Sequence, residues 1–148
     1  MPPARRGLPV LCRAMKQTLL ILFFAFLNVP AFASNWVDVG GNANVHLQLD
    51  RDSIRRIGPK VKVWTTWKFT APQTNAGTGN VYQMARDLDV YNCDEGTTAM
   101  LQQIQYAPDG ITVTDNLVQQ EARGKYQDVA PDTFGESIMK LVCATKLK

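Results

Sequence analysis

Hydrophobic and polar residues alternate in several short runs of this chain, with the period of two that is typical of half-buried β-strands. The clearest run is residues 61–69, which is rich in β-branched and aromatic side chains. Its odd positions are mostly apolar, whereas its even positions are Lys62, Trp64, Thr66 and Lys68. The pattern predicts a strand whose odd-numbered side chains lie in a core and whose even-numbered side chains are partly exposed to water.

Four more runs have strand character: residues 45–49, 81–93, 97–106 and 111–114. Turn signals separate them, most clearly at Pro108-Asp109-Gly110, where proline presets the first turn angle and glycine permits a positive φ. Residues 50–56 predict a turn or one helical turn, and the polar segment 71–80 predicts a loop. Consecutive strands joined in this way favour an antiparallel meander.

The hydrophobic period changes near the C-terminus. Residues 134–145 carry apolar side chains at helical spacing, and Thr133 with Glu136 fits a capping box just before them. An amphipathic helix must bury its apolar stripe, and the sheet is the large partner available to it. The patterns together predict an α+β fold, an antiparallel sheet of about six strands with a C-terminal α-helix packed on it.

The first 33 residues predict a secretory signal peptide and not part of the fold. Lys16 is followed by an apolar run over residues 19–27 and by a small-x-small site that ends at Ala33. The run is shorter than the ~20 residues of a membrane-spanning helix, which favours a cleaved signal over an uncleaved anchor. We expect cleavage after Ala33, no stable membrane span thereafter, and a single domain over residues 34–148.

Removing this leader changes the charge of the protein. The full chain has a net charge of +3, but four of its 16 basic residues and none of its 13 acidic residues lie before residue 34. The remaining 115 residues hold 12 basic and 13 acidic side chains, a net charge of −1. A nucleic-acid-binding protein needs a clustered positive surface, so this composition argues against a nucleic-acid partner.

Cys93 and Cys143 are the two cysteines that follow the leader. An even pair in an exported protein favours a disulfide, with two buried free thiols as the alternative. Cys93 closes a predicted strand and Cys143 flanks the apolar stripe of the predicted helix. A Cys93–Cys143 bridge would therefore join the helix to the sheet, and its loop of about fifty residues would contribute roughly 4 kcal/mol.

The chain offers few groups for catalysis. His46 is its one histidine, no serine lies in a nucleophile motif, and the cysteines and histidine lack the spacing of zinc ligands. Asp87 and Asp89 share one strand face, where paired carboxylates can act as acid and base, although a solvated face is the simpler interpretation. We therefore expect a protein that is not an enzyme and that needs neither a metal ion nor another cofactor.

Protein recognition is the alternative to catalysis. Trp64 alternates with Lys62 and Lys68 on the wetter face of the clearest strand, and tryptophan is enriched at binding hot spots. The competing interpretation places Trp64 under the helix or against a cross-strand aromatic ring. Arg55 and Arg56 form a local basic pair, which is either part of the same recognition surface or a solvated turn.

Several short motifs, each present once, follow one another along the chain. They are Asp52-Ser53-Ile54-Arg55 before the strand of Trp64, then Tyr91-Asn92-Cys93, Tyr106-Ala107-Pro108-Asp109-Gly110, and Pro131-Asp132-Thr133-Phe134-Gly135-Glu136 leading to Val142-Cys143. With these motifs, residues 35–146 resemble the surface-adhesin protein E family. The resemblance implies a small antiparallel sheet with a C-terminal helix, a Cys93–Cys143 bridge, and a bacterial envelope protein that binds host matrix proteins.

Three functions stay open. An exported, adhesin-like envelope protein would recognise a protein partner, such as a host extracellular-matrix protein. A periplasmic inhibitor of an enzyme such as lysozyme would need a rigid protruding loop, for which residues 94–96 and 109–110 are candidates. A small-ligand-binding periplasmic protein would need a pocket with converging polar groups. We expect the first function, in the periplasm, at the cell surface or secreted, and leave a homodimer open.

Overall fold

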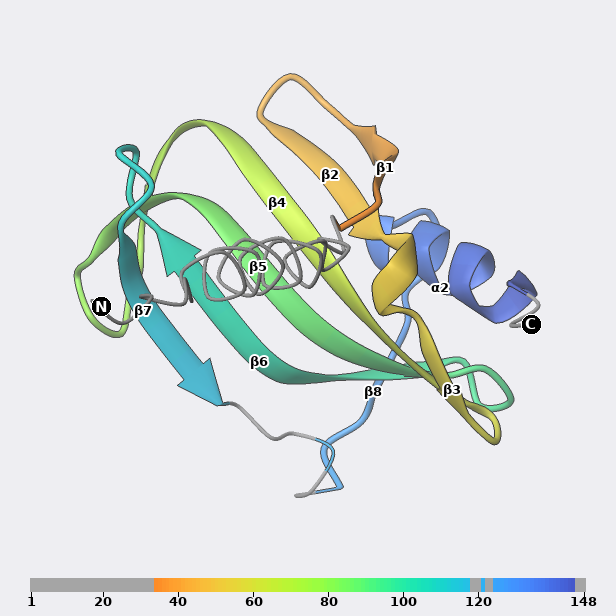
Figure 1. The fold of residues 1–148 in the computed structure, drawn as a ribbon. Coiled ribbons are helices and arrows are strands. Elements are labelled where there is room, and N and C mark those ends of the chain that lie inside the picture. Colours follow the sequence, from red (N-terminus) through yellow and green to blue (C-terminus); the bar gives the residue numbers. More distant parts are fainter. Residues whose placement is uncertain (1–33, 118–120, 122–123, 146–148) are drawn as a thin grey trace, which may run out of the picture. The chain divides into compact units, whose positions relative to one another are not determined.

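The computed structural model describes residues 34–117, 121 and 124–145. Within them it contains one antiparallel sheet and one C-terminal α-helix (Figure 1). The predicted signal peptide, residues 1–33, lies outside the described residues, so its cleavage stays a prediction. Among the described helices, none is long and apolar enough to cross a membrane.

The sheet follows the order of the chain, apart from two short strands. Its main path runs through β1 (Trp36–Gly41), β2 (Val45–Asp50), β4 (Lys60–Thr74), β5 (Val81–Asn92), β6 (Thr97–Tyr106) and β7 (Thr112–Leu117). The short strands are β3 (Arg55–Ile57), which pairs with β4, and β8 (Gln127–Asp128), which pairs with β6. Neighbouring strands are antiparallel throughout, which confirms the predicted meander of about six strands.

The helix α2 (Phe134–Ala144) begins where the sequence predicts it. The Thr133 hydroxyl accepts a hydrogen bond from the Glu136 amide at 3.3 Å, and the Glu136 carboxylate accepts one from the Asp132 amide at 3.0 Å. These bonds satisfy amides that the first helical turn leaves without a partner. The buried face of α2 packs on one face of the sheet, in a core that contains Leu47, Leu49, Val61, Val63, Ile138 and Val142.

The Cys93–Cys143 disulfide joins the helix to the sheet, as predicted. Cys93 follows β5 directly, Cys143 lies in the last turn of α2, and their Cα atoms are 5.8 Å apart. The bridge therefore starts from a strand end. This explains why Cys93 is odd-numbered, although the apolar residues Met84, Leu88 and Val90 before it are even-numbered. Both cysteines pack against the core.

Several segments differ from the sequence-based predictions, among them the short strands β3 and β8, which were not predicted. β1 was not predicted, because it ends in two glycines and contains an irregularity between Asp38 and Gly40. β4 continues to Thr74 across a second irregularity between Lys68 and Gln73, so the predicted loop shortens to residues 75–80. A bulge or irregularity of this kind interrupts the alternation from which strands are recognised.

Residues 50–57 fold into two short elements. The 3₁₀ helix η1 (Arg51–Ser53) supplies the predicted single helical turn, and the Asp50 side chain accepts a hydrogen bond from the Asp52 amide at 3.1 Å. β3 then returns the chain to the edge of β4.

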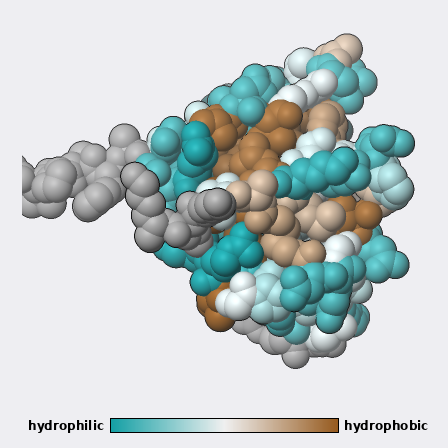
Figure 2. Space-filling view, turned by 90° about the vertical axis from the view of Figure 1, so that its right-hand side faces the viewer, coloured by the Kyte–Doolittle hydropathy of each residue, from teal (hydrophilic) through white to brown (hydrophobic). Residues whose placement is uncertain are grey.

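Figure 2 views the molecule from the side on which α2 and β3 lie in Figure 1, and shows hydrophobic residues at the surface between hydrophilic ones.

The two faces of the sheet differ in what covers them. The odd-numbered side chains of β4 point toward α2, where Trp67 contacts Phe134 edge-on with ring centroids 5.8 Å apart. Because successive side chains of a strand alternate, Trp64 points to the opposite face. We call this opposite side the pocket face.

Candidate functional site

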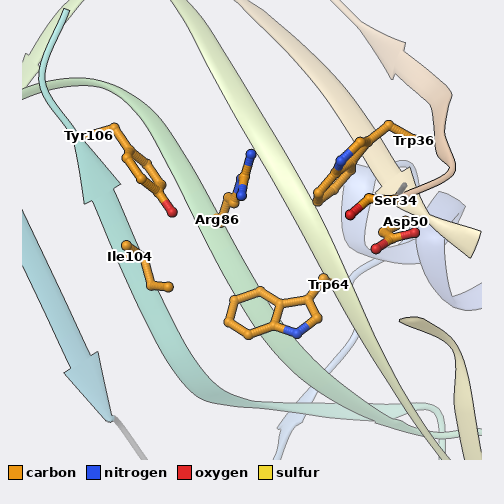
Figure 3. A pocket seen from close by; sticks show the side chains of 7 residues that line it. All are labelled: Ser34, Trp36, Asp50, Trp64, Arg86, Ile104 and Tyr106. Atoms are coloured by element: carbon orange, nitrogen blue, oxygen red, sulfur yellow. The ribbon is translucent and has the colours of Figure 1, made fainter. Parts of the chain in front are cut away.

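The pocket face contains a hollow of about 260 Å³. Its wall is formed by Trp36, Asp50, Trp64, Arg86, Ile104 and Tyr106, with Ser34 at the start of the described chain. Figure 3 shows the Arg86 side chain between the rings of Trp36 and Tyr106, with Trp64 and Ile104 completing the group. Three aromatic rings and one cation from separate strands thus converge on one site.

The register of the strands brings these side chains together. Arg86 of β5 lies opposite Thr66 of β4 on one side and opposite Ile104 of β6 on the other. Trp36 of β1 lies opposite Asp50 of β2. Cross-strand neighbours on one face have Cβ atoms about 5 Å apart, so residues distant in sequence become contacts in the sheet.

The backbone at Trp64 is fixed by the neighbouring 3₁₀ helix. β4 pairs with β2 from Thr65 onward and with β3 up to Lys62, which leaves the Trp64 amide between the two partners. This amide donates a hydrogen bond to the Ser53 hydroxyl at 2.9 Å, and that hydroxyl donates to the Asp50 carbonyl at 2.7 Å. The backbone from which the half-buried Trp64 side chain enters the pocket wall is therefore held by η1.

Arg86 is the cation of the pocket. Its guanidinium carbon lies 5.3 Å from the Trp36 ring centroid and 5.4 Å from that of Tyr106, both within the range of a cation–π contact. No ion pair joins Arg86 to a carboxylate in the part of the chain that the structure describes. Its Nε atom is buried and has no hydrogen-bond partner among those residues.

Asp50 is the carboxylate of the pocket, and its first role is local. Its Oδ1 atom accepts hydrogen bonds from the Asn35 amide at 3.0 Å and from the Asp52 amide at 3.1 Å. These bonds hold the start of β1 and the cap of η1 together. Asp50 therefore brings a negative charge to the pocket wall with one oxygen already in use.

Three of the predicted surface residues share the pocket face. Trp64 lines the pocket itself. Lys62 lies two residues before it, with its Nζ atom 3.4 Å from Oε2 of Glu121. Lys68 is exposed farther along β4, at a shallow hollow that Met84 and Pro108 also line. The two lysines therefore lie on the same face as the pocket, outside its wall.

The two arginines that were candidates for the recognition surface lie apart from these residues. Arg55 turns back onto its own segment, where its Nη1 atom donates to the carbonyls of Asp52 and Ile54 at 2.7 and 2.8 Å. Arg56 reaches the helix, where its Nη2 atom donates to the Cys143 carbonyl at 2.9 Å and to the Val142 carbonyl at 3.3 Å. Arg56 therefore caps the end of α2.

The acidic pair of β5 lies on the helix side of the sheet, so its interpretation as a solvated face is wrong. Asp87 is opposite Thr65 and is buried, and its carboxylate accepts a hydrogen bond from Gln103 at 3.1 Å. Burial raises the pKa of Asp87 to about 6. Burial, together with the charge of Asp87, raises the pKa of Asp89 to about 7.

His46 is remote from the acidic pair. It is exposed, and its Nε2 atom lies 2.8 Å from Oδ2 of Asp38 on the neighbouring strand. This hydrogen bond holds the pKa of Asp38 below its usual value. Among the described residues, no three His, Cys, Asp or Glu side chains lie together in a group that could hold a metal ion.

Sequence reasoning found Trp64 but missed Trp36, Arg86 and Tyr106. No local motif marks these three residues, since each belongs to a different strand. A signal was available for Arg86. It occupies an even-numbered position of its strand, as do Met84 and Leu88, and these two residues continue an apolar face. Pairing that face with the even positions of β4 would have placed an arginine beside Trp64.

Comparisons with known proteins agree with this fold. The family model for surface-adhesin protein E matches residues 36–144. A solved structure of Haemophilus influenzae protein E is 13% identical, covers 78% of this chain and 89% of that chain, and has a TM-score of 0.51. A second crystal form of that protein covers 78% and 92% at 13% identity, with a TM-score of 0.53. Among curated proteins, no sequence matched. The chain belongs to the surface-adhesin protein E family.

Proposed function

We propose that this chain is an exported bacterial surface protein that binds another protein through its pocket face and catalyses no reaction. The observation that carries the proposal is the group of Trp36, Trp64 and Tyr106 around Arg86. Membership of a family named for surface adhesion supports a protein partner, such as an extracellular-matrix component of a host.

The composition of this face is typical of a binding hot spot. Tryptophan, tyrosine and arginine are the residues most enriched among those that dominate binding energies, and they favour a central position with a polar rim. Here the three aromatic rings are half-buried, so that part of each remains available to a partner. Lys68 lies outside the pocket as an exposed charge.

The distribution of titratable groups supports recognition over catalysis. The two acids with raised pKa values, Asp87 and Asp89, lie on the opposite side of the sheet from the pocket. The carboxylate within the pocket wall, Asp50, already accepts two backbone hydrogen bonds. A general acid or base at the pocket would need a group with a matched pKa within reach of a substrate.

Binding of a small ligand is the second candidate, because the pocket joins aromatic rings to one cation and one carboxylate. Its volume of about 260 Å³ lies just below the range of roughly 300–1,000 Å³ in which most ligand pockets fall. A pocket of this size suits a single side chain of a partner better than a whole cofactor.

The test uses two variants of the exported protein, Trp64→Ala and Ile111→Ala. Immobilised protein is exposed to a host matrix extract and, separately, to a periplasmic extract, and the captured partner is then titrated. We expect Trp64→Ala to weaken that binding by about 2 kcal/mol or more, roughly thirtyfold, with an unchanged circular dichroism spectrum.

Ile111→Ala is the matched control, because Ile111 is a large side chain that is 64% exposed in the turn before β7. It should bind as the wild type does. Equal loss in both variants, or full binding by a folded Trp64→Ala protein, would contradict the proposal. A partner captured from the periplasmic extract alone would favour the inhibitor function.

A further inference from the structure

The geometry of the pocket points to a more specific ligand. We propose that the pocket holds the carboxylate of one Asp or Glu side chain of the protein partner, with a neighbouring apolar side chain lying against Trp64 and Ile104. The inference rests on the proposed function, since it takes the pocket face to bind a protein. It adds the chemistry by which that face selects its partner.

The first argument is the charge of Arg86. It is the one basic residue in the pocket wall, and within the described part of the chain no carboxylate pairs with it. Its Nε–H group is buried without an acceptor among the described residues, and a buried donor that stays unsatisfied destabilises the folded protein. A guanidinium that is partly removed from water and lacks a counter-ion gains most from a carboxylate, which accepts two parallel hydrogen bonds from it.

The second argument is the rigidity of that guanidinium. The Trp36 and Tyr106 rings lie at similar distances from it, 5.3 and 5.4 Å. Contact with two rings limits the rotamers of the long Arg86 side chain before any partner arrives. A planar fork that is already oriented loses less conformational entropy on binding, and this raises affinity.

The third argument separates a carboxylate from a phosphate. A phosphate group carries a charge of about −1.5 to −2 at neutral pH. The pocket provides one cation, and the Asp50 carboxylate stands in the same wall. Counted together with Arg86 and Asp50, a phosphate would leave the pocket with a net charge of about −1.5 to −2, whereas a carboxylate would leave it with about −1, so the carboxylate is repelled less by Asp50.

The fourth argument is the apolar part of the wall. Trp64 and Ile104 are half-buried and offer apolar surface next to the cation. An apolar side chain beside the acidic one would cover this surface, and removing apolar surface from water favours binding. The expected recognition element is therefore an exposed acidic residue adjacent to an apolar residue in the partner.

The test follows the ¹⁵N-labelled exported protein by nuclear magnetic resonance during titration with two short peptides. The probes are acetyl-Leu-Glu-Leu-amide and acetyl-Leu-Gln-Leu-amide, which differ in one charge. We expect the glutamate peptide to shift the Nε–H signal of Arg86 and the indole N–H signal of Trp64 in a saturable way. The glutamine peptide should bind at least about tenfold more weakly.

Two variants assign the effect to Arg86. Arg86→Gln should abolish the preference for the glutamate peptide, whereas Lys68→Gln, an equal change of charge on the same face, should retain it. If Arg86→Gln does not fold, Arg86→Lys keeps the positive charge without the fork, and the glutamate peptide should then bind several-fold more weakly.

Three outcomes would overturn the inference: equal binding of the two peptides, shifts confined to residues outside the pocket, or saturation of the Arg86 signal by inorganic phosphate at lower concentration than by the glutamate peptide. None of these outcomes would contradict the proposed function, which is the binding of a whole protein partner by the pocket face. A partner lost in Trp64→Ala but indifferent to Arg86→Gln would refute the carboxylate and leave the proposed function in place.

Discussion

At the scale of single residues, the buried carboxylate of Asp87 links the fold to pH. Burial raises its pKa to about 6, whereas an aspartate in an unfolded chain titrates near 4. Between these two values the folded protein binds more protons than the unfolded protein does. The contribution of Asp87 to the free energy of unfolding should therefore be most favourable below about pH 4 and fall as the pH rises through about 6.

The substitution Asp87→Asn tests this account. Asparagine keeps an oxygen that can accept the hydrogen bond from Gln103 and removes the charge that is costly to bury. We expect the variant to be more stable than the wild type at pH 8, by on the order of 2 kcal/mol, and to depend less on pH between 4 and 7. Urea unfolding at pH 4, 6 and 8 measures this difference.

Asp94→Asn is the matched control, because Asp94 is exposed in the turn after β5. It should reproduce the wild-type pH profile. An Asp87→Asn protein with an unchanged profile would show that the charge at this position costs nothing on folding.

At the scale of elements, Arg56 ties β3 to the end of α2. Its guanidinium donates to the carbonyls of Val142 and Cys143 in the last turn of the helix, where the helix dipole is negative. Arg56→Gln should lower the free energy of unfolding by about 2 kcal/mol. Arg55→Gln, which removes the same charge but touches its own segment alone, should cost less.

Thermal and urea unfolding of the two arginine variants give these values. The binding measurements add a second criterion, since neither arginine lies in the pocket wall. Equal destabilisation, or a loss of partner affinity in Arg56→Gln comparable to that of Trp64→Ala, would contradict the structural role assigned to Arg56.

The disulfide is the second tie between helix and sheet. It closes a loop with a sequence separation of 50 residues, for which the loop-entropy estimate is about 4 kcal/mol. The double variant Cys93→Ser/Cys143→Ser should lose stability of this order, with a lower thermal midpoint. In the native, unreduced protein neither thiol should react with an alkylating reagent, and free alkylation of both would refute the bridge in solution.

The elements could be predicted from sequence to the extent that their pattern was regular. β4 and α2 have clean periods of two and 3.6, and the Thr133 cap marks the helix start. β1 was not predicted, because its glycines and its irregularity interrupt the alternation of apolar and polar residues. Asp87 and Asp89 were misplaced because both faces of β5 are partly buried, so parity alone did not say which face meets the helix.

The site was harder to predict than the fold. Trp64 could be selected from the sequence because it shares one face of the clearest strand with Lys62 and Lys68. Its partners Trp36, Arg86 and Tyr106 come from three other strands, and which of their side chains meet depends on register. Register is set by bulges and turns whose positions the hydrophobic pattern does not reveal.

At the scale of the whole molecule, the sheet separates two tasks. One face carries the helix, the core and the buried acids, and determines stability. The other carries the pocket, and we propose that it binds the partner. Substitutions on the two faces should therefore have separable effects: changes at Arg56, Asp87 or the disulfide alter unfolding, and changes at Trp64 or Arg86 alter binding.

Hydrogen–deuterium exchange of the wild-type protein, alone and with its captured partner, tests the central claim most directly. Backbone amides covered by a partner exchange more slowly than they do in the free protein. The account predicts slower exchange in the segments that contain Trp64, Arg86 and Tyr106, with α2 unchanged. Protection confined to α2 or to the 75–80 loop, with the pocket strands exchanging as in the free protein, would contradict it.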